Sequence, residues 1–223
     1  LLDMFTEKNP SKEYLKHIDY YKKMHLEGHM LSDGRMRKSK NTYEGKSTLG
    51  FAPIIKNIIK KNKLKTLLDY GCGKGYYYDN KFNIEDKKIN LREYWDINID
   101  LYDPCFAKFS EFPEKKFDIT ISVDVFEHIP NGDIDWILEK ICKISNEYIF
   151  LNVACYKAIA LLPNGENAHI NIKEPKWWFD KLISFKKKFM HLKMLCVCAT
   201  KNEKNMLEYY PINIDDKVEN YSS

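Results

Sequence analysis

The feature that most constrains the fold is a short apolar strand that runs directly into a cluster of glycines. Residues 66–70 have the composition of a buried strand, and Gly71, Gly73 and Gly75 follow at once. Glycine lets a backbone approach a ligand closely, because no Cβ intervenes. At the carboxyl edge of a parallel sheet, such a loop is where nucleotide-like cofactors bind. The segment therefore predicts a parallel sheet with a ligand site beside this loop.

The spacing of the glycines separates two well-known kinds of nucleotide site from this one. A dinucleotide-binding loop has the pattern G-x-G-x-x-G, and the position that needs the third glycine is Tyr76 here. A P-loop needs a glycine five residues before its Gly-Lys-Ser, but Lys40 stands there relative to residues 45–47. Neither motif is complete, so the loop predicts a different class of cofactor.

Further along the chain, apolar strands alternate with helical patterns. We expect strands at 97–102, 117–123 and 148–153, and a helix over 134–144. Residues 76–94 have poor periodicity and predict a loop with a short helix. This alternation is typical of an α/β fold with a doubly wound, mostly parallel sheet.

Both ends of the chain differ from this alternating pattern. Two strands predicted at 189–199 and 206–214 flank a polar turn, which indicates a C-terminal antiparallel β-hairpin. The N-terminal part predicts a helix over 11–30, a loop or lid at 43–47, and a second helix whose first turn holds Pro53. We therefore predict that the chain has two parts.

The boundary between the two parts is placed before the helix that holds Pro53. Residues 1–52 are expected to form an N-terminal helical extension or lid, and residues 53–223 the main domain.

Metal-binding patterns are absent from the local sequence. None of the six cysteines lies in a C-x-x-C pair, and buried free thiols suit a reducing compartment. Three histidines lie along the first predicted helix: His17, His25 and His29. His25 and His29 are four apart and could share a metal, but no acidic pattern is nearby, so we expect the three on a solvated face. The sequence thus predicts no metal site.

Composition also narrows the range of partners. No apolar stretch is long enough to span a membrane, and the first residues carry no signal-peptide pattern, so a cytoplasmic location without a membrane partner is expected. The formal charge is only +4, and no stripe of Arg and Lys interleaved with aromatic residues predicts a nucleic-acid surface.

The segment from Leu67 to Gly75 resembles the first motif of class I methyltransferases that depend on S-adenosyl-L-methionine (SAM). The resemblance implies that Gly71, Gly73 and Gly75 pass under the amino-acid end of SAM, and that Asp69 helps to hold its amino group. The physical logic agrees, because a carboxylate favours both the ammonium and the sulfonium of SAM.

The same resemblance places an acid at the end of the second strand, where it takes the ribose hydroxyls. Asp103 fits best, with Asp100 and Asp96 behind it, although Asp103 followed by proline also begins ordinary turns. Only 15 positions separate Asp103 from Asp118, so the third strand is expected to be reduced or missing. Alternatively, 97–102 is itself the third strand, which would move the ribose acid upstream.

Residues 117–129 resemble the fourth-strand motif of the small-molecule branch of this family, where a Glu-His pair follows the strand. The resemblance implies cofactor contacts at Asp124 and Val125. A hydroxyl acceptor benefits from a general base, and the candidates are His128, Glu127 and His169. His128 could instead cap the next helix, and Glu127 could be a hydrogen-bond acceptor on the cofactor side.

These motifs together predict a SAM-dependent methyltransferase with a small-molecule or saccharide acceptor, oxygen being one candidate acceptor atom. The alternatives are an inactive protein that binds SAM or a nucleoside, a nicotinamide oxidoreductase, which Tyr76 and the hairpin oppose, and an RNA methyltransferase, supported only by basic residues 35–46. A DNA base methylase is disfavoured, because Pro104-Cys105 follows an earlier strand than such a nucleophile does and no Asp/Asn-Pro-Pro motif follows Val123.

Overall fold

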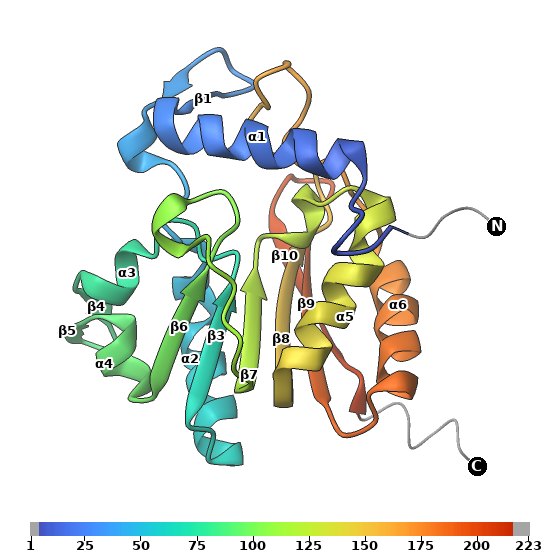
Figure 1. Cartoon of the computed structure of the whole chain (residues 1–223). Helices are drawn as coiled ribbons and strands as arrows, with labels where there is room; N and C mark the ends of the chain where they lie inside the picture. Colours follow the sequence, from blue (N-terminus) through green and yellow to red (C-terminus); the bar gives the residue numbers. More distant parts are fainter. Residues whose placement is uncertain (1–4, 216–223) are drawn as a thin grey trace.

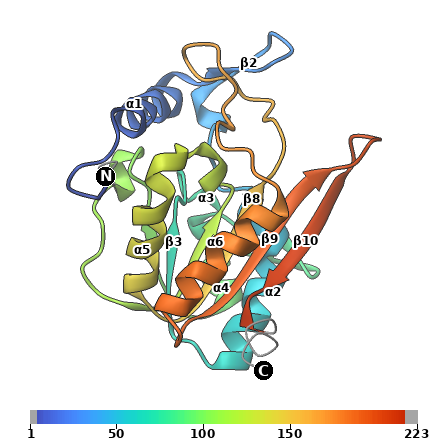
Figure 2. The same cartoon turned by 90° about the vertical axis from the view of Figure 1, so that its right-hand side faces the viewer.

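A computed structural model describes residues 5–215 and has a mixed α/β fold built on one six-stranded sheet (Figure 1). The strand order is β10-β9-β8-β7-β3-β6, and all neighbours are parallel except the β9–β10 pair. The strands are β3 (Thr66–Tyr70), β6 (Asn98–Tyr102), β7 (Phe117–Val123), β8 (Ser145–Ala154), β9 (Lys193–Lys201) and β10 (Leu207–Asn213). The predicted doubly wound sheet and its C-terminal hairpin are confirmed, and Figure 2 shows the hairpin of β9 and β10 on the side that faces the viewer.

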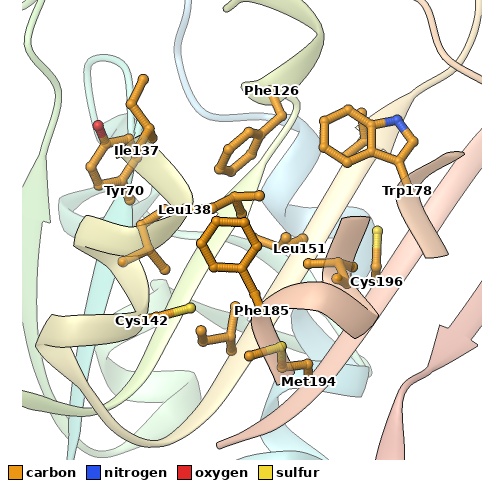
Figure 3. Close-up of a cluster of buried hydrophobic side chains, with 14 of the residues drawn as sticks. Tyr70, Phe126, Ile137, Leu138, Cys142, Leu151, Trp178, Phe185, Met194 and Cys196 are labelled. Atoms are coloured by element: carbon orange, nitrogen blue, oxygen red, sulfur yellow. The ribbon is translucent and has the colours of Figure 1, made fainter. Parts of the chain in front are cut away.

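Helices cover both faces of this sheet, as the alternation of strands and helices predicts. They are α2 (Ser47–Asn62), α3 (Tyr76–Asp79), α4 (Leu91–Trp95), α5 (Ile134–Ile144) and α6 (Pro175–Lys188). Because strand side chains alternate, Leu67 of β3 packs with α2 and α4, whereas Leu68 packs with α5 and α6. The second of these cores includes Phe126 and Trp178, both fully buried (Figure 3). Burial of such side chains contributes roughly 2–3 kcal/mol each.

The predicted loss of the third strand is confirmed within the described residues. Between β6 and β7 the chain forms only a single 3₁₀ turn, Ala107–Phe109. β6 pairs directly with β3 and is the edge of the sheet, so residues 97–102 are the second strand and not the third. Asp103 therefore stands at the end of the second strand, as the resemblance implies, and the alternative that residues 97–102 are the third strand is wrong.

Two local predictions are wrong. Residues 76–94 are not mainly a loop: a hairpin of β4 (Phe82–Ile84) and β5 (Lys87–Ile89) separates α3 from α4. Its turn residues, Glu85 and Asp86, both have positive φ, as a tight hairpin turn requires, although neither is the usual Asn or Gly. Helix α2 begins at Ser47, so Pro53 lies inside the helix and costs it one backbone hydrogen bond.

The N-terminal part lies across the carboxyl ends of the strands (Figure 1). Helix α1 (Lys12–Glu27) begins where the Ser11 hydroxyl accepts a hydrogen bond from the Tyr14 amide. Ser11 in turn donates through its amide and hydroxyl to buried Asp133, next to α5, at 3.0 and 2.5 Å. A short pair, β1 (His29–Met30) and β2 (Met36–Arg37), follows.

The predicted division between residues 52 and 53 lies inside α2 and stays a prediction, and the extreme residues of both predicted parts, 1–4 and 216–223, lie outside the described residues. Among residues 5–215, no helix combines the length and the apolar character that a membrane crossing needs.

Candidate functional site

A cavity of about 420 Å³ lies under α1 at the carboxyl edge of the sheet. Its floor is formed where β3 and β7 lie side by side and the chain order of the strands reverses, which is where open α/β sheets bind ligands. The cavity lining at this sheet edge includes Gly71, Gly73, Asp103, Val123, Asp124, Val125 and His128. The volume is in the range of small-molecule sites.

The glycine loop forms one wall of this cavity, and its glycines are required by close packing. Gly71 and Gly73 have φ of 86° and 59°, where a side chain is strained. A Cβ on Gly71 would lie 2.4 Å from a methyl carbon of Val125, and one on Gly73 would lie 2.3 Å from the Tyr43 carbonyl oxygen. Gly75 is not part of the cavity lining, and its Cβ would meet Leu101 at 2.8 Å.

Asp103 lines the same wall and is held by the backbone. One carboxylate oxygen accepts a hydrogen bond from the Gly73 amide at 2.8 Å, and the other accepts one from the Cys105 amide at 2.8 Å. Burial raises the pKa of Asp103 above its ordinary value, although these amide donors act in the opposite direction. The carboxylate therefore fixes the loop at the place predicted for the ribose, and the ribose contact itself stays a prediction.

Asp69 lies behind this wall, outside the cavity lining. Its carboxylate is 2% exposed and accepts a hydrogen bond from the Tyr78 hydroxyl at 2.7 Å. Burial raises the pKa of Asp69 to about 7, against the effect of the Tyr78 hydrogen bond. Its predicted contact with an amino group stays a prediction.

A second part of the cavity wall brings together the three predicted catalytic residues and Asp124. Each of these four side chains offers one nitrogen or oxygen atom, and these atoms all lie within 4.8 Å of one another. Asp124 follows β7, and the other two members of the local motif belong to the 3₁₀ helix Phe126–His128. His169 comes from the long segment after β8, so only the fold places it here.

The carboxylates of this cluster are held from behind. Glu127 is fully buried, and its Oε1 accepts a hydrogen bond from the Ala154 amide at 2.9 Å, whereas no N–H or hydroxyl within residues 5–215 donates to its Oε2. Asp124 has φ of 61°, and its Oδ2 accepts a hydrogen bond from the Ser47 hydroxyl at 3.1 Å. Burial and then the Asp124 charge raise the pKa of Glu127 well above its ordinary value.

Both imidazoles of the cluster have a backbone carbonyl oxygen beside Nδ1. His128 Nδ1 lies 2.9 Å from the Ala168 carbonyl oxygen, and His169 Nδ1 lies 2.5 Å from the Tyr156 carbonyl oxygen. A carbonyl oxygen only accepts, so His169 Nδ1 carries the proton and its Nε2 keeps a lone pair. His128 Nδ1 also lies 2.7 Å from the Tyr21 hydroxyl, which can donate to it, so the carbonyl alone does not fix the tautomer of His128. Burial, and then the charge of His169, lowers the pKa of His128 to about 4. These rings are therefore neutral bases at neutral pH.

The N-terminal part forms the roof, and here the sequence-based expectation for three histidines is wrong. His17, His25 and His29 are buried and line the cavity, because the helix face that carries the first two turns toward the sheet. The ring of His25 stacks on Phe106 and that of His29 on Tyr43. Burial lowers the pKa of both His25 and His29 to about 4, with nearby cations acting in the same direction.

Sequence reasoning missed this roof, although a signal was present. The cavity-lining residues of α1 recur at helical spacing and are mostly aromatic or imidazole; they are Tyr14, His17, Ile18, Tyr21 and His25. The predicted ordered segment at 43–47 also belongs to the roof. Tyr43 and Glu44 accept hydrogen bonds from loop amides at 2.7 and 3.1 Å.

Comparison with known proteins finds one family whose matched segment contains the residues of both walls. A family model described as a methyltransferase domain matches residues 47–199, which is more than half of the chain. The match runs from the start of α2 into β9 and so includes the glycine loop, Asp103 and all four residues of the cluster. No curated protein and no solved structure gives a significant match.

Proposed function

Because this chain belongs to the class I family of SAM-dependent methyltransferases, we propose that it transfers the methyl group of SAM to a small-molecule or saccharide acceptor. The observation that carries the proposal is that the glycine loop, Asp103 and the cluster around His128 line one cavity. Family membership argues against the nicotinamide oxidoreductase that the sequence left as an alternative.

The glycine-loop wall suits the cofactor. Gly71 and Gly73 expose backbone without Cβ atoms, and the carboxylates of Asp103 and Asp124 face the same space. Carboxylates stabilise the ammonium and sulfonium charges that SAM carries. When bound, SAM supplies an electrophilic methyl group, and the chain's own part is to align that group with an acceptor.

The second part of the wall suits the acceptor. The Nε2 lone pair of His169 is available to take a proton from a hydroxyl, because its Nδ1 is committed to the Tyr156 carbonyl oxygen. His128 offers the same lone pair when its Nδ1 donates to the Ala168 carbonyl oxygen. Oxygen is therefore the acceptor atom that these residues serve best. Tyr21 supports His128 from the roof, with its hydroxyl 2.7 Å from Nδ1.

The roof limits the size of the acceptor. Helix α1 and the segment that carries Tyr156 and Ala158 both line the cavity, so the acceptor enters a covered space. A small molecule or saccharide fits this arrangement better than DNA, RNA or a membrane surface. The expected cytoplasmic location stays a prediction.

Calorimetric titration with SAM and S-adenosylhomocysteine tests the proposal. We expect both to bind to the intact chain, and we expect S-adenosylhomocysteine to form when a panel of hydroxylated small molecules and saccharides is supplied with SAM. A folded chain that binds neither would contradict the proposal. Binding without product formation on any acceptor would favour the inactive SAM-binding protein instead.

A further inference from the structure

The cluster around His128 has the composition of a metal site. Asp124, Glu127, His128 and His169 contribute two carboxylates and two imidazoles, with one ligand atom of each within 4.8 Å of the others. The sequence predicts no such site, because His169 is far from the other three along the chain. The set is mixed in chemistry and converges from two separate segments.

A buried oxygen in this cluster lacks a hydrogen-bond donor among the described residues. Glu127 is 0% exposed, and no N–H or hydroxyl of the described residues donates to its Oε2, although the Asp124 carboxylate lies close enough to share a proton with Glu127. A buried carboxylate oxygen without a donor is costly, and a second carboxylate beside it adds repulsion. Either a proton shared with Asp124 or a bound cation would remove this cost.

The imidazoles favour the cation. Histidines that bind metals usually donate their other ring N–H to a carbonyl or carboxylate, which fixes the tautomer and the ring orientation. His169 has this arrangement, with Nδ1 directed at the Tyr156 carbonyl oxygen. His128 Nδ1 lies beside the Ala168 carbonyl oxygen and the Tyr21 hydroxyl, and the first of these contacts is of the same kind. A proton shared between the two carboxylates would not require it.

The backbone conformation of Asp124 also supports a functional site at this position. Asp124 has φ of 61°, in the left-handed region that costs energy for a residue with a side chain. Such strain persists where the surrounding structure needs it, and here it lies at the end of β7, beside the cavity.

We propose that Asp124, Glu127, His128 and His169 bind one divalent transition-metal ion at the cavity wall. Two nitrogen and two carboxylate oxygen donors suit manganese, iron, cobalt or zinc better than calcium or magnesium, which prefer oxygen ligands alone. Three of the four residues line the cavity and Glu127 lies beneath them, so the ion has an open side toward the cavity. The proposal does not depend on methyl transfer, and it replaces the base role given above to His128 and His169, because a ring nitrogen that binds the ion has no lone pair left to take a proton.

The test is titration of the full chain with Mn²⁺ after treatment with a chelator. Calorimetry and the electron paramagnetic resonance signal of free Mn²⁺ should both report one ion per chain. Glu127→Gln keeps the size of the side chain, and we expect it to weaken Mn²⁺ binding at least about 10-fold, as we do for His169→Asn. Glu203→Gln and His191→Asn, at exposed positions, are the matched controls and should bind as the intact chain does.

Thermal unfolding of each variant establishes that it is folded, and Asp124→Asn replaces any variant that is not. Failure of the folded intact chain to bind Mn²⁺, Co²⁺ and Zn²⁺ would overturn the proposal and leave a proton-sharing pair. Binding that both ligand variants leave unchanged would also overturn it, because the ion would then lie elsewhere. SAM titration of the same samples reports on the proposed function separately.

Discussion

The two walls of the cavity are built on opposite principles. On the glycine-loop wall, both oxygens of Asp103 are occupied by backbone amides, and the loop itself is packed against Tyr43 and Val125. On the other wall, the side chains are held from behind, and the acceptor atoms to which no described residue donates include Glu127 Oε2 and the Nε2 lone pair of His169. One wall is closed in its hydrogen bonding, and the other is left open.

This difference suggests that the glycine-loop wall determines the shape of the cavity and that the cluster supplies its reactive groups. A wall with satisfied polar groups holds its outline, so it suits a ligand that is always the same, such as a cofactor. A wall with unpaired hydrogen-bond acceptor atoms is stabilised most when a proton, a cation or the hydroxyl of a methyl acceptor binds to those atoms. Substitutions on the glycine-loop wall should therefore change the shape of the cavity and lower the affinity for SAM. Substitutions in the cluster should change its charge and lower the rate of methyl transfer.

The largest effect is expected from Gly73→Arg on the closed wall. Any Cβ at this position would lie 2.3 Å from a backbone oxygen of Tyr43, and a long side chain would also enter the cavity. We expect SAM binding to fall by at least about 1000-fold, or ~4 kcal/mol, in calorimetric titration.

The matched control is Gly34→Ala. Gly34 has a similarly positive φ of 83°, but a Cβ there would meet nothing within 4 Å. It therefore carries the backbone strain without the collision. If Gly34→Ala weakened SAM binding as much as Gly73→Arg, global destabilisation and not the closed wall would be the cause.

The closed wall is also the part that the sequence predicted best. Its residues lie within short segments, residues 66–75 and Asp103, whose spacing alone fixes where they meet at a sheet edge. Glycines with positive φ beside a buried strand leave few alternatives. The hairpin β4–β5 escaped prediction because Glu85 and Asp86 replace the usual turn residues.

The open wall and the roof were harder to predict because they depend on distant contacts. His169 reaches His128 only after the chain has returned from β8, and no local spacing records this. The burial of His17 and His25 depends on α1 lying across the strands, which the anchor between Ser11 and Asp133 establishes. Local pattern showed a helix, but not which of its faces is covered.

Asp69 gives a pH test of how well the closed wall satisfies its carboxylates. Burial raises its pKa to about 7 from an ordinary 3.8, so the folded chain holds a proton that the unfolded chain has released. Its contribution to stability should therefore fall as the pH rises from about 4 to about 7, by ~1.4 kcal/mol per pH unit at most. The total loss would approach ~4 kcal/mol.

Thermal unfolding of the intact chain and Asp69→Asn between pH 4 and pH 8 measures this loss. The variant should lack the decline and become the more stable protein at pH 8. Asp100→Asn, on the neighbouring strand, removes a partly exposed carboxylate that pairs with Lys115 at 2.8 Å and should leave the decline intact. If the stabilities of the intact chain and Asp69→Asn changed with pH in the same way, Asp69 would not be the cause of the decline.

His128→Asn tests the open wall. The change removes the Nε2 lone pair while leaving the glycine loop untouched, so methyl transfer should slow by about 100-fold, with the SAM dissociation constant altered by less than about 3-fold. Initial rates of S-adenosylhomocysteine formation and SAM calorimetry measure the two effects. His191→Asn, an exposed site, controls for loss of a histidine. A large loss of SAM affinity in His128→Asn would mean that the two walls are not separate.

The smallest effect is expected from Asp103→Asn, which changes the chemistry of the closed wall and keeps its shape. The amide offers one acceptor oxygen where Gly73 and Cys105 each donate to a separate oxygen, so one amide donor would face an NH₂ group. We expect SAM binding to weaken about 10-fold, or ~1.4 kcal/mol, together with a lower melting temperature. If only the melting temperature fell, Asp103 would serve to hold the glycine loop and would make no contact with the cofactor. In that case the closed wall would recognise SAM by its outline alone, and the ionic part of recognition would have to come from Asp124.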